Sequence, residues 1–289
     1  TRPAPVNAAG IATINALAPG RTFFGVGAGN TAMRIMDLPP QPIAEYDQYL
    51  STIKPLLAGD EAIYHHRGRD IPIRHIMPDE GFVNLTDPIP MYVSGFGPKS
   101  LALAGKHGDG AVLAFTSNPA TMESMWLMIE AGANDNFERD DFYTTALTAM
   151  LVLDKGEAVD SARVKHEVGA MAIAALHYSY DQYRNFGHQP PSHLTAIWPD
   201  YIKMIEAVPL ARRHQRIHQG HNCWVLPEEE KFLTKSLLQA SCLIGTQDQL
   251  IETLQGLQAA GLNQVMNLPA FAPRFEIMAR IARDIIPNV

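Results

Sequence analysis

The sequence is poor in cysteine, in charged residues and in long apolar runs. Its 289 residues include two cysteines, Cys223 and Cys242, which match no zinc or redox spacing and are typical of a reducing compartment. Lysine and arginine number 23 against 30 aspartates and glutamates, giving a net charge of −7, and they form no basic cluster. Without such a cluster, nucleic acid is not expected as a partner. No apolar run reaches the ~18 residues of a membrane span. We therefore expect a cytoplasmic protein that binds neither nucleic acid nor membranes.

Apolar residues make up 46% of the chain, enough for a sizeable core. Short apolar segments alternate with segments of helical periodicity. We expect helices over residues 8–21, 42–59, 98–108, 118–135, 160–176, 246–261 and 272–287, with two more near 200–214 and 227–240. We expect strands over residues 22–25, 90–94, 110–115, 142–153 and 263–268, irregular chain over 60–88, and an aromatic and polar stretch over 177–200. The alternation predicts an α/β fold with parallel strands and helical crossovers.

Two architectures fit this pattern, an open doubly wound sheet and a (β/α)8 barrel. Both bind ligands at the carboxyl ends of their strands. Glycines follow two different strands here, at Gly27 and Gly29 and again at Gly95 and Gly97. A dinucleotide-binding sheet usually offers one such glycine loop, so two loops favour the barrel.

The first glycine loop lies in RTFFGVGAGN, residues 21–30. It does not fit the dinucleotide pattern G-x-G-x-x-G, because its third glycine is wrongly spaced and no helix is expected to open directly after it. A nucleotide-binding P-loop would end in Gly-Lys-Ser or Gly-Lys-Thr, which is absent. The glycines either permit a tight turn with positive φ or let a ligand approach the backbone, and the pattern alone leaves both interpretations open.

Four segments, in order, carry a resemblance to a known family: APGRTFFGVGAGNTA, EYDQYLSTIKPLLAGDE, DPIPMYVSGFGPKSLALAGKHGDGAVLA and LIGTQDQLIETLQGLQAAGLNQV. Together they resemble the luciferase-like monooxygenase superfamily over most of the chain, and its methylenetetrahydromethanopterin reductase-like branch in particular. The resemblance implies a single domain over 1–289, a TIM barrel of the bacterial luciferase-like type with insertions at 60–88 and 177–240. It also implies FMN or the deazaflavin coenzyme F420 across the carboxyl-terminal face of the barrel.

The start of the chain resembles an internal part of the family's domain. Family chains begin with a strand and two further β/α units before the motif that opens this sequence. The five expected strands also fall short of the eight that a closed barrel needs. We therefore expect the N-terminal units of the barrel, with the catalytic residues they carry, to be missing from this chain.

The resemblance implies two walls of a cofactor site. One is the loop after the first expected strand, and the other follows the second expected strand, whose end would hold the cofactor's phosphate arm. The cofactor-binding residues expected are Gly27, Ala28, Gly29 and Asn30 in the first wall, Ser94, Gly95, Phe96 and Gly97 in the second, and Phe115 and Thr116 after the third strand. Some deazaflavin dehydrogenases of the family have threonine and glutamate where this chain has Ala28 and Asn30, so a sugar-phosphate dehydrogenase activity is not expected.

Two histidines, His218 and His221, lie three residues apart in RIHQGHNCW. They resemble half of a metal site, but only Cys223 and Glu228 stand near enough to complete it, so no metal is expected. The resemblance implies instead that this segment roofs a substrate pocket, where a histidine could transfer a proton. With Asn30, these histidines are the candidate catalytic residues, and a purely structural hydrogen-bonding role is the alternative.

The predicted function is that of an oxidoreductase transferring a hydride between bound coenzyme F420 or FMN and a small organic substrate. One alternative is an FMN-dependent monooxygenase that uses reduced flavin and O2, and a second is a flavin-binding relative without catalysis. The polar insertions favour an enzyme, because a non-catalytic relative needs no substrate pocket. A homo-oligomer is expected, and the sequence names no substrate.

Overall fold

The computed structural model describes residues 2–114 and 118–289, and the chain divides into two compact units. Unit 1 comprises Thr1–Arg34, Leu38–Leu113 and Ser124–Thr145, and unit 2 comprises Ile35–Asp37, Ala114–Glu123 and Ala146–Val289. Each unit is described by itself below.

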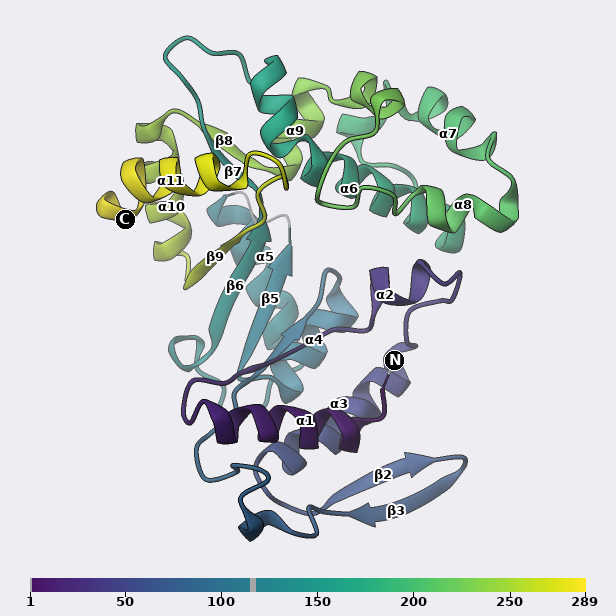
Figure 1. The fold of residues 1–289 in the computed structure, drawn as a ribbon, viewed down its shortest axis with the longest axis vertical. Coiled ribbons are helices and arrows are strands. Elements are labelled where there is room, and N and C mark those ends of the chain that lie inside the picture. Colours follow the sequence, from purple (N-terminus) through teal and green to yellow (C-terminus); the bar gives the residue numbers. More distant parts are fainter. Residues whose placement is uncertain (1, 115–117) are drawn as a thin grey trace. The chain divides into compact units, whose positions relative to one another are not determined.

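A sheet of four neighbouring strands organises unit 1 (Figure 1). The strands run in the order β1 (Phe24–Val26), β4 (Met91–Ser94), β5 (Gly110–Ala114) and β6 (Tyr143–Thr148), and β1–β4 and β4–β5 pair in parallel. The last residue of β5 and the second half of β6, from Ala146, are counted in unit 2. Successive side chains of a strand point to opposite faces. Met91 and Val93 of β4 and Ala111 and Leu113 of β5 therefore share one face, and all four are fully buried.

Helices connect these strands, and their ends follow local sequence signals. They are α1 (Ala4–Leu17), α2 (Asn30–Arg34), α3 (Ile43–Leu57), α4 (Pro98–His107) and α5 (Pro119–Glu130). Helix α4 begins with proline at its first position, where the missing N–H is not needed. The Ser100 hydroxyl closes its first turn by donating to the Gly97 carbonyl at 3.0 Å.

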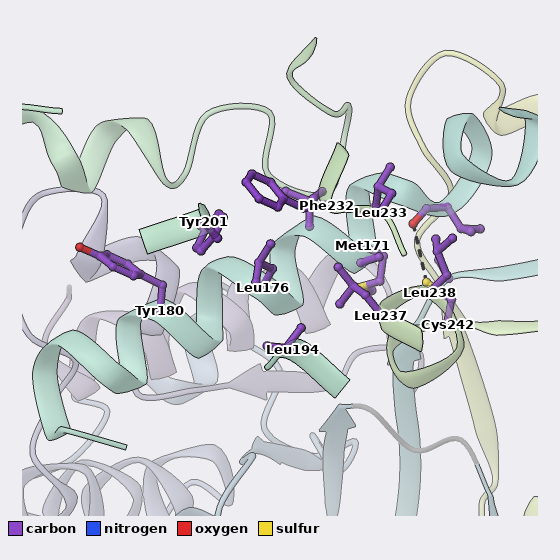
Figure 2. Packing of buried hydrophobic residues seen from close by; sticks show 14 of the residues in the cluster. Met171, Leu176, Tyr180, Leu194, Tyr201, Phe232, Leu233, Leu237, Leu238 and Cys242 are labelled. Carbon is purple, nitrogen blue, oxygen red and sulfur yellow. Dashed lines mark hydrogen bonds between the residues drawn. The ribbon is translucent and has the colours of Figure 1, made fainter. Parts of the chain in front are cut away.

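Unit 2 combines short strands with a group of helices. Strand β7 (Met150–Val152) pairs in parallel with β8 (Leu243–Gly245), and β9 (Gln264–Asn267) follows β6 in the sheet order. The helices are α6 (Ala162–Phe186), α7 (Trp198–Glu206), α8 (Leu210–Arg216), α9 (Lys235–Ser241), α10 (Gln247–Ala259) and α11 (Arg274–Asp284). Figure 2 shows the apolar side of α6 packed against α9 and the 3-10 helix η4 (Pro227–Phe232). The Cys242 thiol is buried in this cluster and donates to the Val168 carbonyl at 3.6 Å.

The predicted α/β order is confirmed where the apolar pattern was clear. The five expected strands are the strands of the sheet β1-β4-β5-β6-β9, which does not close into a barrel among the described residues. The run 142–153 is interrupted at Ala149 and forms β6 and β7, because its second half pairs with β8 instead.

The expectation of irregular chain over residues 60–88 is wrong, and the helix expected over 160–176 is longer than expected. Residues 60–88 contain an antiparallel hairpin of β2 (Ala62–His66) and β3 (Arg69–Ile73), whose turn residues Arg67 and Gly68 both have positive φ. Such a turn matches the twist of a hairpin. Helix α6 also runs on through the first ten residues of the stretch 177–200, because His177 and Tyr180 are buried in unit 2.

Candidate functional site

The first glycine loop follows β1 at the carboxyl edge of the unit 1 sheet. The Tyr46 hydroxyl of α3 donates to the Val26 carbonyl at 3.0 Å, and the Gln41 amide donates to the Ala28 carbonyl at 3.0 Å. Burial raises the pKa of Tyr46 above its usual range, so this phenol stays protonated as a donor. Two hydrogen bonds therefore hold the loop, one from α3 and one from the segment before it.

Helix α2 opens directly at Asn30, so the expectation that no helix follows the glycines is wrong, although this helix has five residues. The Met33 amide donates to the Gly29 carbonyl at 2.8 Å, and this bond starts the turn. The Arg34 side chain is buried and its Nε donates to Asn30 Oδ1 at 2.6 Å. The Asn30 amide oxygen thus positions Arg34.

The second wall follows β4 and lies beside the first. Val26 and Val93 are paired in the parallel ladder, so the residues after them are neighbours. A Cβ placed on Gly27 would lie 3.4 Å from the Ser94 Cβ. Ser94 is half-buried, Phe96 is 39% exposed, and Gly97 is the N-cap of α4. The structure therefore brings the two predicted walls together, whereas Phe115 and Thr116 lie outside the described residues.

The glycines of the two walls differ in whether the fold itself requires glycine at their positions. Gly29 has φ +82°, a conformation that strains any other residue. A Cβ on Gly95 would lie 2.8 Å from the Ser100 carbonyl carbon, so the approach of α4 excludes it. A Cβ on Gly25 or Gly97 would meet nothing within 4 Å, and a Cβ on Gly27 would make an ordinary contact. Nothing described in the fold itself requires glycine at these last three positions.

Gly25 is a candidate that the sequence interpretation did not assign to the site. Gly25 lies in β1 and Gly27 directly follows its last residue, Val26, so the two-residue spacing leaves the same face of the sheet without side chains at both positions. Tyr92 and Ser94 share that face, because Gly25 pairs with Tyr92. The period-two spacing of the glycines was the signal that could have found Gly25.

His218 and His221 lie in unit 2, after α8, within a buried polar cluster. The His218 side chain is 5% exposed, and its Nε2 is 3.9 Å from Asp181 Oδ2 on α6. The two imidazole rings are neighbours, with centroids 5.6 Å apart. Burial, with a smaller contribution from the charge of His177, lowers the pKa of His221. A catalytic role for these histidines stays a prediction.

The same cluster contains an ion pair that the sequence interpretation missed. His177 Nε2 on α6 is 2.8 Å from Glu229 Oε1, and Arg216 Nη1 donates to the same oxygen at 3.1 Å. Burial alone would raise the pKa of Glu229, but the hydrogen bond and charge of His177 and the contacts of Arg216 lower it overall. His177 and Asp181 are four residues apart, a spacing that puts them on one face of a helix once the segment is known to be helical.

Two further expectations concern metals and membranes. Among residues 2–114 and 118–289, no group of three or more histidine, cysteine, aspartate or glutamate side chains could hold a metal ion. No helix in these ranges is long and apolar enough to cross a membrane.

Comparisons of the sequence with known proteins identify its family. The sequence model of the luciferase-like monooxygenase family matches residues 1–264. The 5,10-methylenetetrahydromethanopterin reductase of Archaeoglobus fulgidus is 27% identical, over 98% of this chain and 78% of that protein.

Solved structures are similar over nearly the whole chain. A coenzyme F420-dependent tetrahydromethanopterin reductase from Methanopyrus kandleri has a TM-score of 0.65 at 19% identity, over 99% of this chain and 80% of that one. The oxygenating constituent of 3,6-diketocamphane monooxygenase from Pseudomonas putida, a complex with FMN, has a TM-score of 0.50 at 15% identity, over 100% of this chain and 76% of that one. These likenesses show the fold, an α/β arrangement of the luciferase-like TIM-barrel type.

Proposed function

This chain belongs to the luciferase-like monooxygenase family, and from that membership we propose that it is an oxidoreductase that binds coenzyme F420 or FMN at the two glycine walls of unit 1. Its reaction would transfer a hydride between this cofactor and a small organic substrate. The relatives named above include a coenzyme F420-dependent reductase, which favours the deazaflavin, and a monooxygenase in complex with FMN, which keeps oxygenation with FMN as the alternative.

One observation carries the proposal: Gly25, Gly27 and Gly97 are glycines that no described part of the fold requires. Gly27 and Gly97 follow the carboxyl ends of β1 and β4, where barrel proteins place their ligands, and Gly25 lies within β1 on the same face as Gly27. A planar ring needs a wall without side chains, and a Cβ on Gly27 would project from that wall. The residues present therefore fit a flavin-type ring.

The second wall would hold the phosphate of the cofactor. The first turn of α4 leaves the amides of Lys99 and Ser100 without partners from within the helix. Amides at a helix N-terminus bind anions, and Pro98 presents no N–H of its own there. The Ser94 hydroxyl, on the neighbouring strand end, would add a hydrogen bond.

When bound, the deazaflavin supplies two-electron hydride transfer, whereas FMN also permits the activation of oxygen. The chain itself would fix the ring through a backbone that is already held by Tyr46 and Gln41, so little reorganisation is needed. Asn30 would keep Arg34 in place below the first wall. Proton transfer by His218 or His221, a cytoplasmic location and a homo-oligomeric state stay predictions.

The test is a titration of the purified full chain with coenzyme F420 and, separately, with FMN, followed by absorbance and fluorescence. The native chain should bind at least one of them. Gly27→Val should raise the dissociation constant by about 100-fold, or ~2.8 kcal/mol, because the new side chain occupies the place of the ring. Gly97→Val should weaken binding through the phosphate arm.

The control is Gly10→Val, at an exposed position of α1 where a Cβ also meets nothing within 4 Å. It should leave both affinities unchanged. Thermal melting of each variant checks that the fold is retained. Equal affinity in the native chain and Gly27→Val would remove the first wall from the site, and binding of neither cofactor would overturn the proposed function.

A further inference from the structure

Unit 2 contains a pocket of about 520 Å³ that shares no residue with the glycine walls. Its walls come from the first turns of α6, from residues 223–225, from η4 and the residue after it, and from residues 270–273 after β9. A volume of this size is typical of small-molecule sites, which span roughly 300–1,000 Å³.

The walls of this pocket are fixed by bonds between distant segments. The Phe271 amide donates to the Cys223 carbonyl at 2.9 Å, and the Ala270 amide donates to the Glu167 carbonyl at 3.3 Å. A Cβ on Gly169 of α6 would lie 2.8 Å from Leu233 Cδ1, so the helix backbone directly supports the apolar wall. The pocket is therefore already formed in the structure.

One side of the pocket suits an aromatic ring. Val225 and Leu233 supply apolar surface, and Trp224 lines the pocket with 56% of its surface exposed. The turn before it holds this residue: Gly220 has φ +75°, and a Cβ there would lie 2.9 Å from the Trp224 Nε1. An exposed indole that is held in place offers a stacking surface for a planar ligand.

The polar groups of the pocket suit a ligand that carries both a carboxylate and a hydrogen-bond donor. Lys165 and His166 of α6 and Glu230 of η4 line it. Among the residues that the structure describes, neither Lys165 nor Glu230 forms an ion pair, whereas Arg163 on the same helix is bound by Glu157 and Glu167. Lys165 is thus available for a ligand's carboxylate, and Glu230 for a ligand's O–H or N–H.

We infer that this pocket binds a small aromatic carboxylic acid that carries a hydroxyl or amino group on its ring. The ring packs between Trp224 and the apolar wall, the carboxylate pairs with Lys165, and the ring substituent donates to Glu230. This site needs neither coenzyme F420 nor FMN, so it stands or falls independently of the function proposed above.

The test uses Cys223 as a reporter, because it lines the pocket and is partly exposed, whereas Cys242 is buried. The thiol is alkylated in the full chain, without added cofactor, in the presence of 4-hydroxybenzoate, 4-aminobenzoate or 3-hydroxybenzoate. At least one of these acids should slow the alkylation of Cys223, with a dissociation constant that calorimetry reproduces. Phenol, which lacks the acid, and cyclohexanecarboxylate, which lacks the ring, should protect less.

Matched variants locate the binding. Lys165→Met and Glu230→Gln should each weaken the binding of the protecting acid by about tenfold, the typical effect of one hydrogen bond to a charged group. Ala162→Trp, at an exposed position that lines the pocket, should abolish it by filling the space. Lys155→Met, at an exposed lysine outside the pocket, should leave it unchanged.

Absence of protection by all three acids would overturn the inference. Equal weakening by Lys165→Met and Lys155→Met would also overturn it, because the effect would then come from net charge. Calorimetry of Cys223→Ser must still detect the acid, since the thiol is a reporter and not part of the recognition.

Discussion

The strands of unit 1 have aromatic side chains near their amino ends, whereas glycines follow their carboxyl ends. Phe23 stacks on Tyr92 with ring centroids 5.1 Å apart, and Tyr92 stacks on Tyr143 at 5.2 Å. Gly27 and Gly97 follow the carboxyl ends of β1 and β4, where an added Cβ would make an ordinary contact with Ser94 at Gly27 and would meet nothing within 4 Å at Gly97. In a barrel-type sheet the amino ends serve stability and the carboxyl ends serve binding, and here that division is visible in residue types.

Glycine itself occurs at both ends, for opposite reasons. Gly110 opens β5 beneath the stacked tyrosines, where a Cβ would lie 2.3 Å from the Tyr143 carbonyl oxygen and 2.8 Å from Tyr92 Cδ1. Because Gly110 has no side chain, the rings of Tyr92 on β4 and Tyr143 on β6 can stack across β5. At the amino end glycine is thus required by the fold, whereas the described fold has room for a Cβ at Gly27 and Gly97.

The largest effect on stability is expected from Gly110→Ala. The added methyl group would collide with backbone and ring atoms, so we expect the free energy of unfolding to fall by about 3 kcal/mol. Urea unfolding monitored by circular dichroism measures it. Gly25→Ala, in strand β1 of the same sheet, where a Cβ would meet nothing within 4 Å, is the matched control. A similar loss of unfolding free energy in both variants would show that the fold requires glycine no more at Gly110 than at Gly25.

A smaller effect is expected from Tyr92→Leu. Removing the central ring of the stack should lower the free energy of unfolding by about 1 to 2 kcal/mol, because two ring contacts are lost. Ser94→Ala, two residues along the same face of β4, should change it by no more than ~0.5 kcal/mol. Urea midpoints of the two variants give the comparison, and a larger loss in Ser94→Ala would contradict it.

The smallest expected effect is the loss of the stability contributed by Asp47 at low pH. Asp47 of α3 binds Lys106 at 2.9 Å and His107 at 2.5 Å, both in the last turn of α4. Burial alone would raise the pKa of Asp47, but hydrogen bonds from Lys106 and His107 lower it. A lowered pKa in the folded chain adds stability above the unfolded pKa of about 3.9, and this stability is lost as the pH falls through the folded pKa.

We therefore expect Asp47→Asn to lower the urea midpoint at about pH 6 and to have a smaller effect at about pH 2, because the stability that comes from the lowered pKa is lost as the pH falls through the folded pKa. A difference that stays the same at both pH values would show that the carboxylate charge is not what stabilises this contact.

The sequence was sufficient to place the five strands of the main sheet along the chain, but not to explain why individual glycines and buried polar residues are there. The five strands of the sheet were predicted because each is a short apolar run next to a turn signal. Gly95 and Gly97 looked equivalent in sequence, but their difference is a 2.8 Å distance to Ser100 that depends on how α4 packs. The pairing of His177 with Glu229 was out of reach for a similar reason, since its partners are 52 residues apart.

The glycine pattern of β1 also has a consequence for the order of folding. Glycine loses more backbone entropy on folding than any other residue, and β1 contributes three residues at one end of the sheet order, pairing with β4. Such a strand gains little from its own side chains, so it should join the sheet after β4 and β5 have paired and should open first. Hydrogen exchange would then be fastest at the β1 amides, and any ligand that covers Gly25 and Gly27 would slow it there before it slows exchange elsewhere in the sheet.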